Sequence, residues 1–192
     1  LIPNNSRIIS TKNLYFSAAD QTTGAEGNTS LAMRLNTSIE NCYIDIVYTL
    51  AADDYMLGMS IQPHNMQWAL AQNMSSIEMQ WTQLIPQQEK GRKFEEKYAQ
   101  LQYMFVGGDV EKLSEVKADR AKESARLKWI GYKDQFFSTV LIAEDGFESS
   151  ELESTPMGAH TRHIKEYKST CSLPLDITGK KTTDLRYYLG PN

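Results

Sequence analysis

Apolar and polar residues alternate in several short runs along the chain. In the run 42–50, Cys42, Ile44 and Ile46 fall on one side, and residues such as Asp45 fall on the other. A period of two places successive side chains on opposite faces of a β-strand, so one face of a sheet can be buried. The same alternation occurs in the runs 30–36, 55–62, 76–84, 99–105 and 184–190. The pattern predicts an antiparallel sheet protein in which each sheet buries one face.

The segment that contains Trp129, Tyr132 and Phe136 changes its period partway through. These three bulky residues have the spacing of one face of a helix. The run 138–142 that follows is apolar and rich in β-branched residues, which is typical of a buried strand, and the turn-forming residues 144–146 close it. We therefore expect a helical turn of aromatic residues that leads directly into a strand, with these rings sealed inside the layers.

Three stretches are too polar to predict a packed element. The charged stretch 89–97 is interpreted as a solvated loop, because its basic and acidic residues are interleaved. The stretch 109–129 has only a sparse apolar stripe, which favours a partly helical or mobile excursion. The stretch 149–169 is interpreted as a loop that rises into a strand at 164–173. The expected fold is therefore mainly β, with one or two short helices.

Length and charge limit the possible functions. The chain has 192 residues, of which 41% are hydrophobic, so it can form one domain or two small ones. Its 20 basic and 24 acidic residues give a net charge of -4, which argues against nucleic acid or an anionic membrane surface as the main partner. No apolar run approaches the roughly 18 to 20 residues that cross a bilayer. Because the chain begins with Leu1, we expect a processed chain or an excised domain.

Residues that carry chemistry are sparse. His160, His163 and Glu166 could bind a metal if their segment were helical, but the polar flanks favour solvent-exposed loop histidines. No combination of nucleophile, base and positioning group stands out elsewhere in the chain. We therefore expect a protein that is not an enzyme and that has no catalytic residue, metal or cofactor.

The tryptophans and cysteines leave alternatives open. Aromatic faces can stack on sugars, but Trp81 and Trp129 lie on apolar stripes, which favours core packing, and Trp68 alone is expected to be exposed. Cys42 and Cys171 each lie in an alternating run. Two buried thiols and a single disulfide are both compatible with this pattern.

Several stretches, in their order along the chain, resemble one known family. An aromatic turn that begins at Trp129 and runs into an apolar strand, and a closing strand at 185–191, are similar to the periplasmic domain of the YidC-type membrane protein insertase, especially as it occurs in Bacteroidetes-like bacteria. The stretches 88–106 and 44–61 resemble further parts of that domain. The residues that carry this signature are structural ones: Trp129, Tyr132, Phe136, Phe137, Tyr188, Gly190 and Pro191.

The resemblance implies a fold and a location. The fold is a twisted, antiparallel two-layer β-supersandwich, similar to mutarotase-like domains. Residues 1–192 are expected to form a single periplasmic domain that is the C-terminal part of the full family domain, with N-terminal strands missing or reduced. The domain would lie on the periplasmic side of the bacterial inner membrane, as a soluble part of a membrane-anchored protein.

The resemblance also implies a function without catalysis. The domain would assist the insertion and folding of inner-membrane proteins, as a chaperone-like accessory that contacts Sec translocon subunits or nascent membrane proteins. Nucleic acid is not an expected partner. One alternative is a carbohydrate-binding or sugar-converting domain of mutarotase-like fold, and another is a structural module of the export machinery with no ligand.

Overall fold

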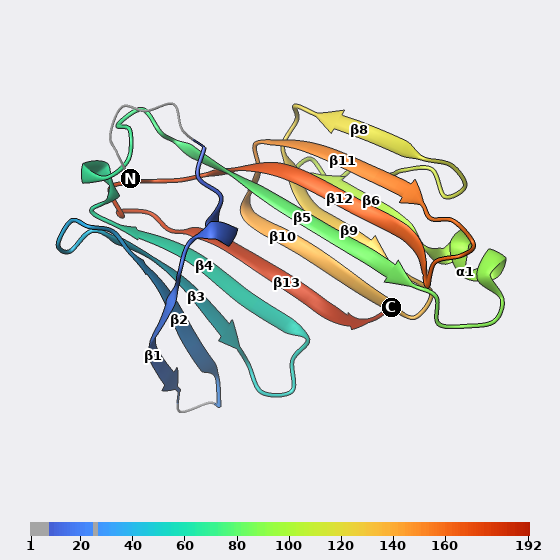
Figure 1. Cartoon of the computed structure of the whole chain (residues 1–192), viewed down its shortest axis with the longest axis horizontal. Helices are drawn as coiled ribbons and strands as arrows, with labels where there is room; N and C mark the ends of the chain where they lie inside the picture. Colours follow the sequence, from blue (N-terminus) through green and yellow to red (C-terminus); the bar gives the residue numbers. More distant parts are fainter. Residues whose placement is uncertain (1–7, 25–26) are drawn as a thin grey trace. The chain divides into compact units, whose positions relative to one another are not determined.

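The computed structural model describes residues 8–24 and 27–192, and most of this part of the chain forms β-strands (Figure 1). The chain divides into two compact units. The first unit runs to Ser76 and includes Pro174–Leu185, whereas the second comprises Ile77–Leu173 and Arg186–Asn192. Strand β13 (Thr183–Pro191) begins in the first unit and ends in the second.

The first unit is built on a meander of four antiparallel strands, each paired with the next. Their bounds are β1 Ser17–Thr23, β2 Thr29–Asn36, β3 Tyr43–Leu50 and β4 Met56–His64. The predicted alternation sets like residues opposite each other, because Met33 on β2 pairs with Ile46 on β3. Two short 3-10 helices also belong to this unit, η1 (Thr11–Asn13) and η2 (Met66–Trp68).

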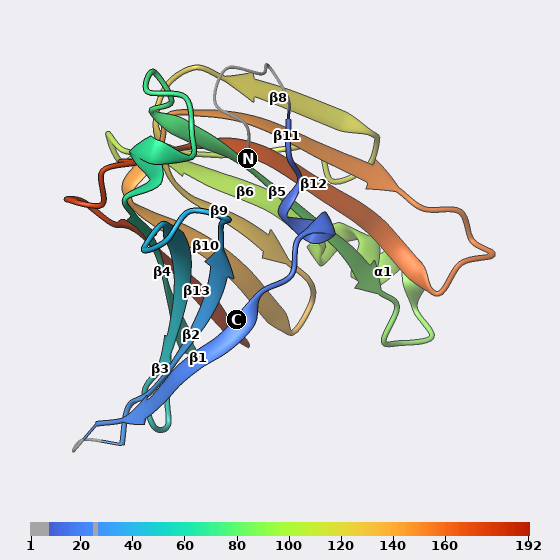
Figure 2. The ribbon, with the colours of Figure 1, turned by 60° about the vertical axis from the view of Figure 1, so that its left-hand side comes forward.

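The second unit consists of two layers. One layer has the strand order β10-β9-β6-β7, and the other has the order β5-β12-β11-β8. The bounds are β5 Ser76–Pro86, β6 Gln100–Phe105, β7 Val110–Lys112, β8 Asp119–Glu123, β9 Leu127–Lys133, β10 Phe137–Phe147, β11 Ser149–Pro156 and β12 His163–Pro174. The helix α1 (Arg92–Tyr98) follows β5. Figure 2 shows β5, β12 and β11 in a layer separate from β6, β9 and β10.

The core of the second unit lies between its two layers. Tyr132 on β9 and Tyr167 on β12 are fully buried, and their ring centroids lie 5.1 Å apart. Leu141 on β10 and Leu152 on β11 are buried with them. These findings confirm the predicted mainly β fold of antiparallel sheets in a sandwich-like arrangement. None of the helices in residues 8–24 and 27–192 is long and apolar enough to cross a membrane.

The helical turn predicted around Trp129 and Tyr132 is wrong. The segment is strand β9, which forms a hairpin with β10, and Tyr132 pairs with Thr139 in its ladder. The cross-strand hydrogen bonds and the burial of alternate residues outweigh the local helical spacing, because propensity is a weak determinant beside tertiary context. The predicted strand 138–142 is correct, but the expected turn at 144–146 lies within β10, where the register shifts between Ile142 and Phe147.

The three polar stretches also form regular structure. The stretch 109–129 contains the strands β7 and β8 in place of a helical or mobile excursion. The stretch 149–169 contains all of β11 and the start of β12, so only its middle is a loop. The stretch 89–97 enters α1, where the Glu95 carboxylate accepts hydrogen bonds from the backbone N–H groups of residues 88 and 89. Pairing with a neighbour supplies the stability that such polar segments lack alone.

Candidate interaction surface

The outer face of the layer formed by β6, β9 and β10 carries the candidate surface. On β9, Tyr132 points into the core, so Gly131 and Lys133 point to the opposite face of the strand. The register then fixes which residues share that face. Its rows, read from β6 through β9 to β10, are Met104, Trp129 and Ile142; Gln102, Gly131 and Val140; and Gln100, Lys133 and Ser138. We call these nine residues the outer grid.

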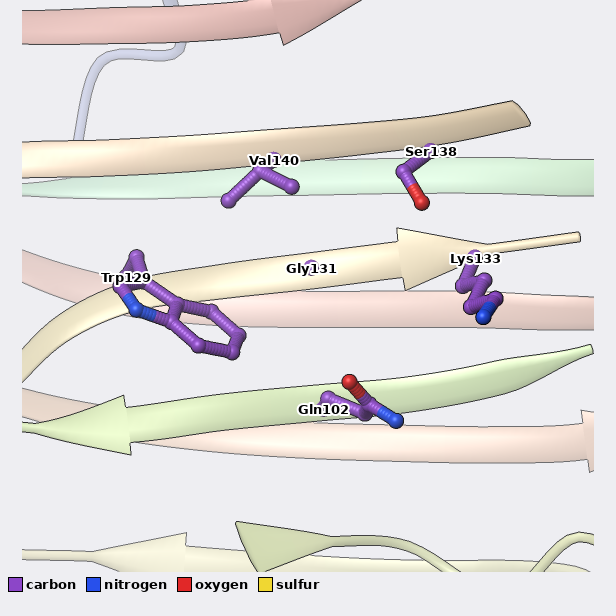
Figure 3. Close-up of a pocket in the computed structure, with 6 residues that line it drawn as sticks. All are labelled: Gln102, Trp129, Gly131, Lys133, Ser138 and Val140. Atoms are coloured by element: carbon purple, nitrogen blue, oxygen red, sulfur yellow. The ribbon is translucent and has the colours of Figure 1, made fainter. Parts of the chain in front are cut away.

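A shallow pocket of about 130 Å³ lies at the centre of the outer grid (Figure 3). It is lined by Gln102, Trp129, Gly131, Lys133, Ser138 and Val140. The pocket exists because Gly131 has no side chain. A Cβ atom at Gly131 would lie 3.5 Å from the Trp129 ring and 3.5 Å from a Val140 methyl group. The floor is thus backbone, and larger side chains of the neighbouring rows form the walls.

The two sides of the pocket differ in polarity. Trp129 and Val140 form an apolar side, whereas Gln102, Lys133 and Ser138 provide amide, amine and hydroxyl groups. The Gln102 amide donates a hydrogen bond of 2.6 Å to the Gln100 side-chain oxygen, so its orientation is fixed. None of the six lining residues carries a carboxylate, an imidazole or a thiol. The pocket has the chemistry to hold one short side chain through apolar contacts and hydrogen bonds.

The core beneath the outer grid is held by a polar contact between the layers. The Tyr132 ring stacks on Trp81 of β5, with centroids 3.7 Å apart and an interplanar angle of 16°. The Tyr132 hydroxyl lies 2.6 Å from the Ser169 hydroxyl on β12 and 3.2 Å from the Trp81 carbonyl oxygen. Burial raises the pKa of Tyr132 well above its ordinary value. Strand β9 is thus fixed to both β5 and β12.

The predicted signature residues lie in different environments. Tyr132 is buried and Trp129 is partly buried on the outer grid, but Phe136 is 39% exposed and Phe137 is 53% exposed. The expectation that these rings are all sealed inside is therefore wrong. Phe136 lies in the turn between β9 and β10, and Phe137 is the first residue of β10, so both rings lie at the end of this hairpin.

The closing strand meets the same turn. The backbone N–H of Asn192 donates to the Phe136 carbonyl oxygen, and the Asn192 side-chain amide donates to the Gln135 carbonyl oxygen. Within the closing strand, Gly190 is buried and Pro191 is exposed, and the Tyr188 hydroxyl donates a hydrogen bond of 2.6 Å to the Pro191 carbonyl oxygen. The fold therefore brings the two halves of the predicted signature together.

The other candidate residues do not form a site. His160 lies in the exposed loop before β12, and Glu166 forms an ion pair with Lys168. In residues 8–24 and 27–192, no group of three His, Cys, Asp or Glu residues could hold a metal ion. Cys42 and Cys171 are both buried, free thiols. Burial raises the pKa of Cys171 to about 11, so this thiol is unreactive at neutral pH.

The sequence reading missed most of the pocket. Trp129 was singled out, but Gln102, Lys133 and Ser138 were not, because their common face depends on the strand register. Gly131 was the available signal, since a glycine inside an alternating run often marks a gap in the packed surface. Trp68 is 52% exposed, which confirms its predicted position. Trp81 packs on Tyr132, which confirms the core role expected for it.

Comparisons with known proteins match the whole chain to one family. A family model described as the YidC periplasmic domain matches residues 1–192. The membrane protein insertase YidC of Parabacteroides distasonis is 44% identical over 194 residues, which cover 100% of this chain and 29% of that protein. Proteins of the same name from Azobacteroides pseudotrichonymphae and Bacteroides fragilis are 41% and 38% identical, and the alignments cover 100% and 98% of this chain and 30% of each relative.

The chain therefore spans about 30% of the length of the curated relatives it matches. Among solved structures, a TPR-domain containing protein from Parabacteroides distasonis aligns with a TM-score of 0.48 and 10% identity, over 92% of this chain and 34% of that chain. This structural likeness is too weak to support any inference about fold or function.

Proposed function

Since the chain belongs to the YidC periplasmic domain family, we propose that it is a non-catalytic domain that assists the insertion and folding of inner-membrane proteins. It lies on the periplasmic side of the inner membrane, and its family is that of an insertase and not of a catalytic enzyme. In this proposal the domain acts by contact, either with Sec translocon subunits or with nascent membrane proteins. Residues 1–192 act as a single functional domain, which forms the C-terminal part of the full family domain.

The family match over residues 1–192 carries the proposal. The chemistry of the outer grid supports it, because the pocket offers apolar and polar contacts and its lining carries no carboxylate, imidazole or thiol. A surface of this kind is suited to docking and not to turnover. The relatives all carry the insertase name, which does not favour the alternative of a carbohydrate-binding or sugar-converting domain.

Site-specific photo-crosslinking in cells tests the proposal. A photoreactive amino acid is placed at Gln102 or Lys133 of the outer grid in the full-length protein, and at the exposed Lys168 of β12 as a control in the other layer. We expect the grid positions to capture translocon subunits or stalled nascent membrane proteins. Capture of neither class from the grid, or from further surface positions, would contradict the proposed function.

A further inference from the structure

Strands at the edges of the sheets differ in how they are protected. In the described part of the chain, four strands lie at sheet edges. Strand β1 is an edge strand of the first unit, β7 is an edge strand of one layer of the second unit, and β5 and β8 are the two edges of the four-stranded layer. An edge strand has a row of unpaired backbone N–H and C=O groups, which another extended chain can pair with. Natural proteins usually block such edges with short strands, charged side chains or bulges.

Three of these edges carry that protection. Strand β7 has only 3 residues, two of which are charged. Strand β8, with the sequence DRAKE, has a charged residue at every position except Ala121. Strand β1 pairs with β2 through an irregular register between Ala18 and Gln21. None of the three is a long, regular and uncharged edge.

Strand β5 is neither short nor rich in charge. It has 11 residues with the sequence SIEMQWTQLIP, and Glu78 is its only charged residue. Its exposure alternates from Ile77 onward, so that Gln80, Thr82 and Leu84 are exposed while the residues between them are partly or fully buried. Leu84 is a large apolar side chain that is 42% exposed. Figure 1 shows β5 at the border of its sheet, next to β12.

Contacts with the core also hold β5 in place. The Trp81 ring stacks on the fully buried Tyr132, whose hydroxyl donates to the Trp81 carbonyl oxygen. Ile85 near the end of the strand is 1% exposed and fixes a second point. An edge that is already ordered loses little conformational entropy when another strand pairs with it.

We propose that β5 is a docking edge on which an extended, uncharged segment of a nascent membrane protein adds as a fifth strand to the four-stranded sheet. This inference rests on the proposed function and specifies where and how the client binds. Main-chain hydrogen bonds provide the affinity in strand addition, and they are independent of side-chain sequence. A binder of many different membrane proteins needs that independence.

The charge distribution favours this client over a charged peptide. Membrane-spanning segments are long stretches with few charges, and β5 presents one carboxylate in 11 residues, whereas β8 presents charges at four of its 5 positions. The inward-facing Ile77 and Met79 are only partly buried, so apolar side chains of an added strand gain a surface to pack on. At roughly 3.4 Å per residue, an edge of this length accommodates about ten residues of the client.

Binding of synthetic peptides to the full-length protein in lipid nanodiscs tests the mode of recognition. The probe is a fluorescent 12-residue peptide of alternating valine and threonine, and its binding is measured by fluorescence polarisation. Its matched counterpart has the same sequence with N-methyl groups on alternate residues, which removes the backbone donors along one edge. We expect the first peptide to bind at least ten-fold more tightly than the second. Equal affinity, or no binding of either peptide, would overturn the proposal.

Paired variants locate the binding edge. The double variant Gln80→Lys/Thr82→Lys adds the charges that normally block an edge, at two exposed positions. The control Ser149→Lys/Thr155→Lys adds the same charge at exposed positions of β11, an interior strand of the same sheet. We expect the β5 variant to weaken peptide binding at least five-fold and the β11 variant to leave it unchanged. Equal effects of the two variants would overturn the assignment to β5.

A second copy of the chain is the competing occupant of this edge. Sedimentation of the full-length protein that shows a dimer, lost in Gln80→Lys/Thr82→Lys but kept in the β11 control, would overturn the client proposal.

A photoreactive residue at Thr82 on β5 should crosslink stalled nascent chains in cells at least five-fold more strongly than one at Lys122 on β8. Crosslinks from Gln102 without any from Thr82 would overturn this inference and leave the proposed function standing. Crosslinks from no position would contradict both.

Discussion

The hydroxyl oxygen of Tyr132 lies 2.6 Å from the hydroxyl oxygen of Ser169, and this contact joins β9 to β12 across the two layers of the second unit. Both residues are almost completely buried. A buried hydroxyl that loses its partner also loses the compensation for its desolvation. The pair therefore provides a direct measure of how strongly the layers are tied together.

The substitution Tyr132→Phe should destabilise the chain, because it removes the hydroxyl while keeping the ring on Trp81. We expect a loss of about 1 to 3 kcal/mol in the free energy of unfolding, measured in urea. The double variant Tyr132→Phe/Ser169→Ala should lose less than the sum of the two single variants, since no unpaired hydroxyl remains. Strict additivity would show that the contact contributes nothing.

Gly179 is a position where no side chain fits. Its φ is +78°, and a Cβ atom there would collide with the backbone carbonyl group of Pro63. We expect Gly179→Ala to reduce the free energy of unfolding by about 2 kcal/mol or more, through strain and displacement of backbone. Gly158→Ala is the control, because nothing lies within 4 Å of its Cβ position. Similar urea midpoints for the two variants would contradict this account.

Lys165 should make stability rise with pH above neutrality. Its ammonium group is buried and donates to the carbonyl oxygens of Ala99 and Glu115, and desolvation lowers its pKa to about 8. Between this value and its ordinary pKa, the unfolded chain binds more protons than the folded chain, so stability increases with pH. The rise between pH 7 and pH 9 should be about 1 kcal/mol in urea titrations.

The same profile should then turn downward. Burial raises the pKa of Cys171 to about 11 and that of Tyr167 further above its ordinary value, so the folded chain keeps protons that the unfolded chain releases. Stability should therefore fall with pH above about 10, where the unfolded tyrosines ionise.

The variant Lys165→Met is the control for the rise attributed to Lys165, and in this variant the rise between pH 7 and pH 9 should be absent. A rise that persists in this variant would assign the effect to another group.

Arg92 should hold the loop between β11 and β12 against α1. Its guanidinium group donates to the carbonyl oxygens of Met157 at 2.7 Å and His163 at 3.0 Å, and it forms an ion pair of 2.8 Å with Glu96. Lysine cannot reproduce this planar set of donors. We expect Arg92→Lys to lower the free energy of unfolding by about 1 to 3 kcal/mol and to speed proteolysis of the loop.

The exposed Lys93 provides the matched control for that experiment. Lys93→Ala should stay within about 0.5 kcal/mol of the parent chain. If Arg92→Lys is equally silent in urea and in limited proteolysis, the carbonyl contacts do not hold the loop.

Several features of this protein could be predicted from its sequence alone. The alternation in the runs 30–36, 42–50 and 76–84 correctly predicted strands, because side chains on a strand must alternate whatever the strand pairs with. It did not predict every buried face, since Asp45 is the buried residue of β3 and lies opposite the apolar face expected to be covered. The core position of Trp81 followed from the same pattern, and the exposure of Trp68 followed from its place outside the apolar stripes. The resemblance of several stretches, in their order along the chain, was sufficient to indicate the family.

Only the tertiary structure decided the rest. The spacing of Trp129 and Tyr132 is compatible with a helix, but pairing of β9 with β6 and β10 made it a strand and put the two rings on opposite faces. The sequence alone also could not predict that the charged segment 119–123 forms strand β8, or that β5 lies at a sheet edge, since an edge exists only once the order of strands is known. Local spacing specifies which side of an element is apolar, whereas register and strand order depend on contacts between residues far apart in the chain, which no local pattern encodes.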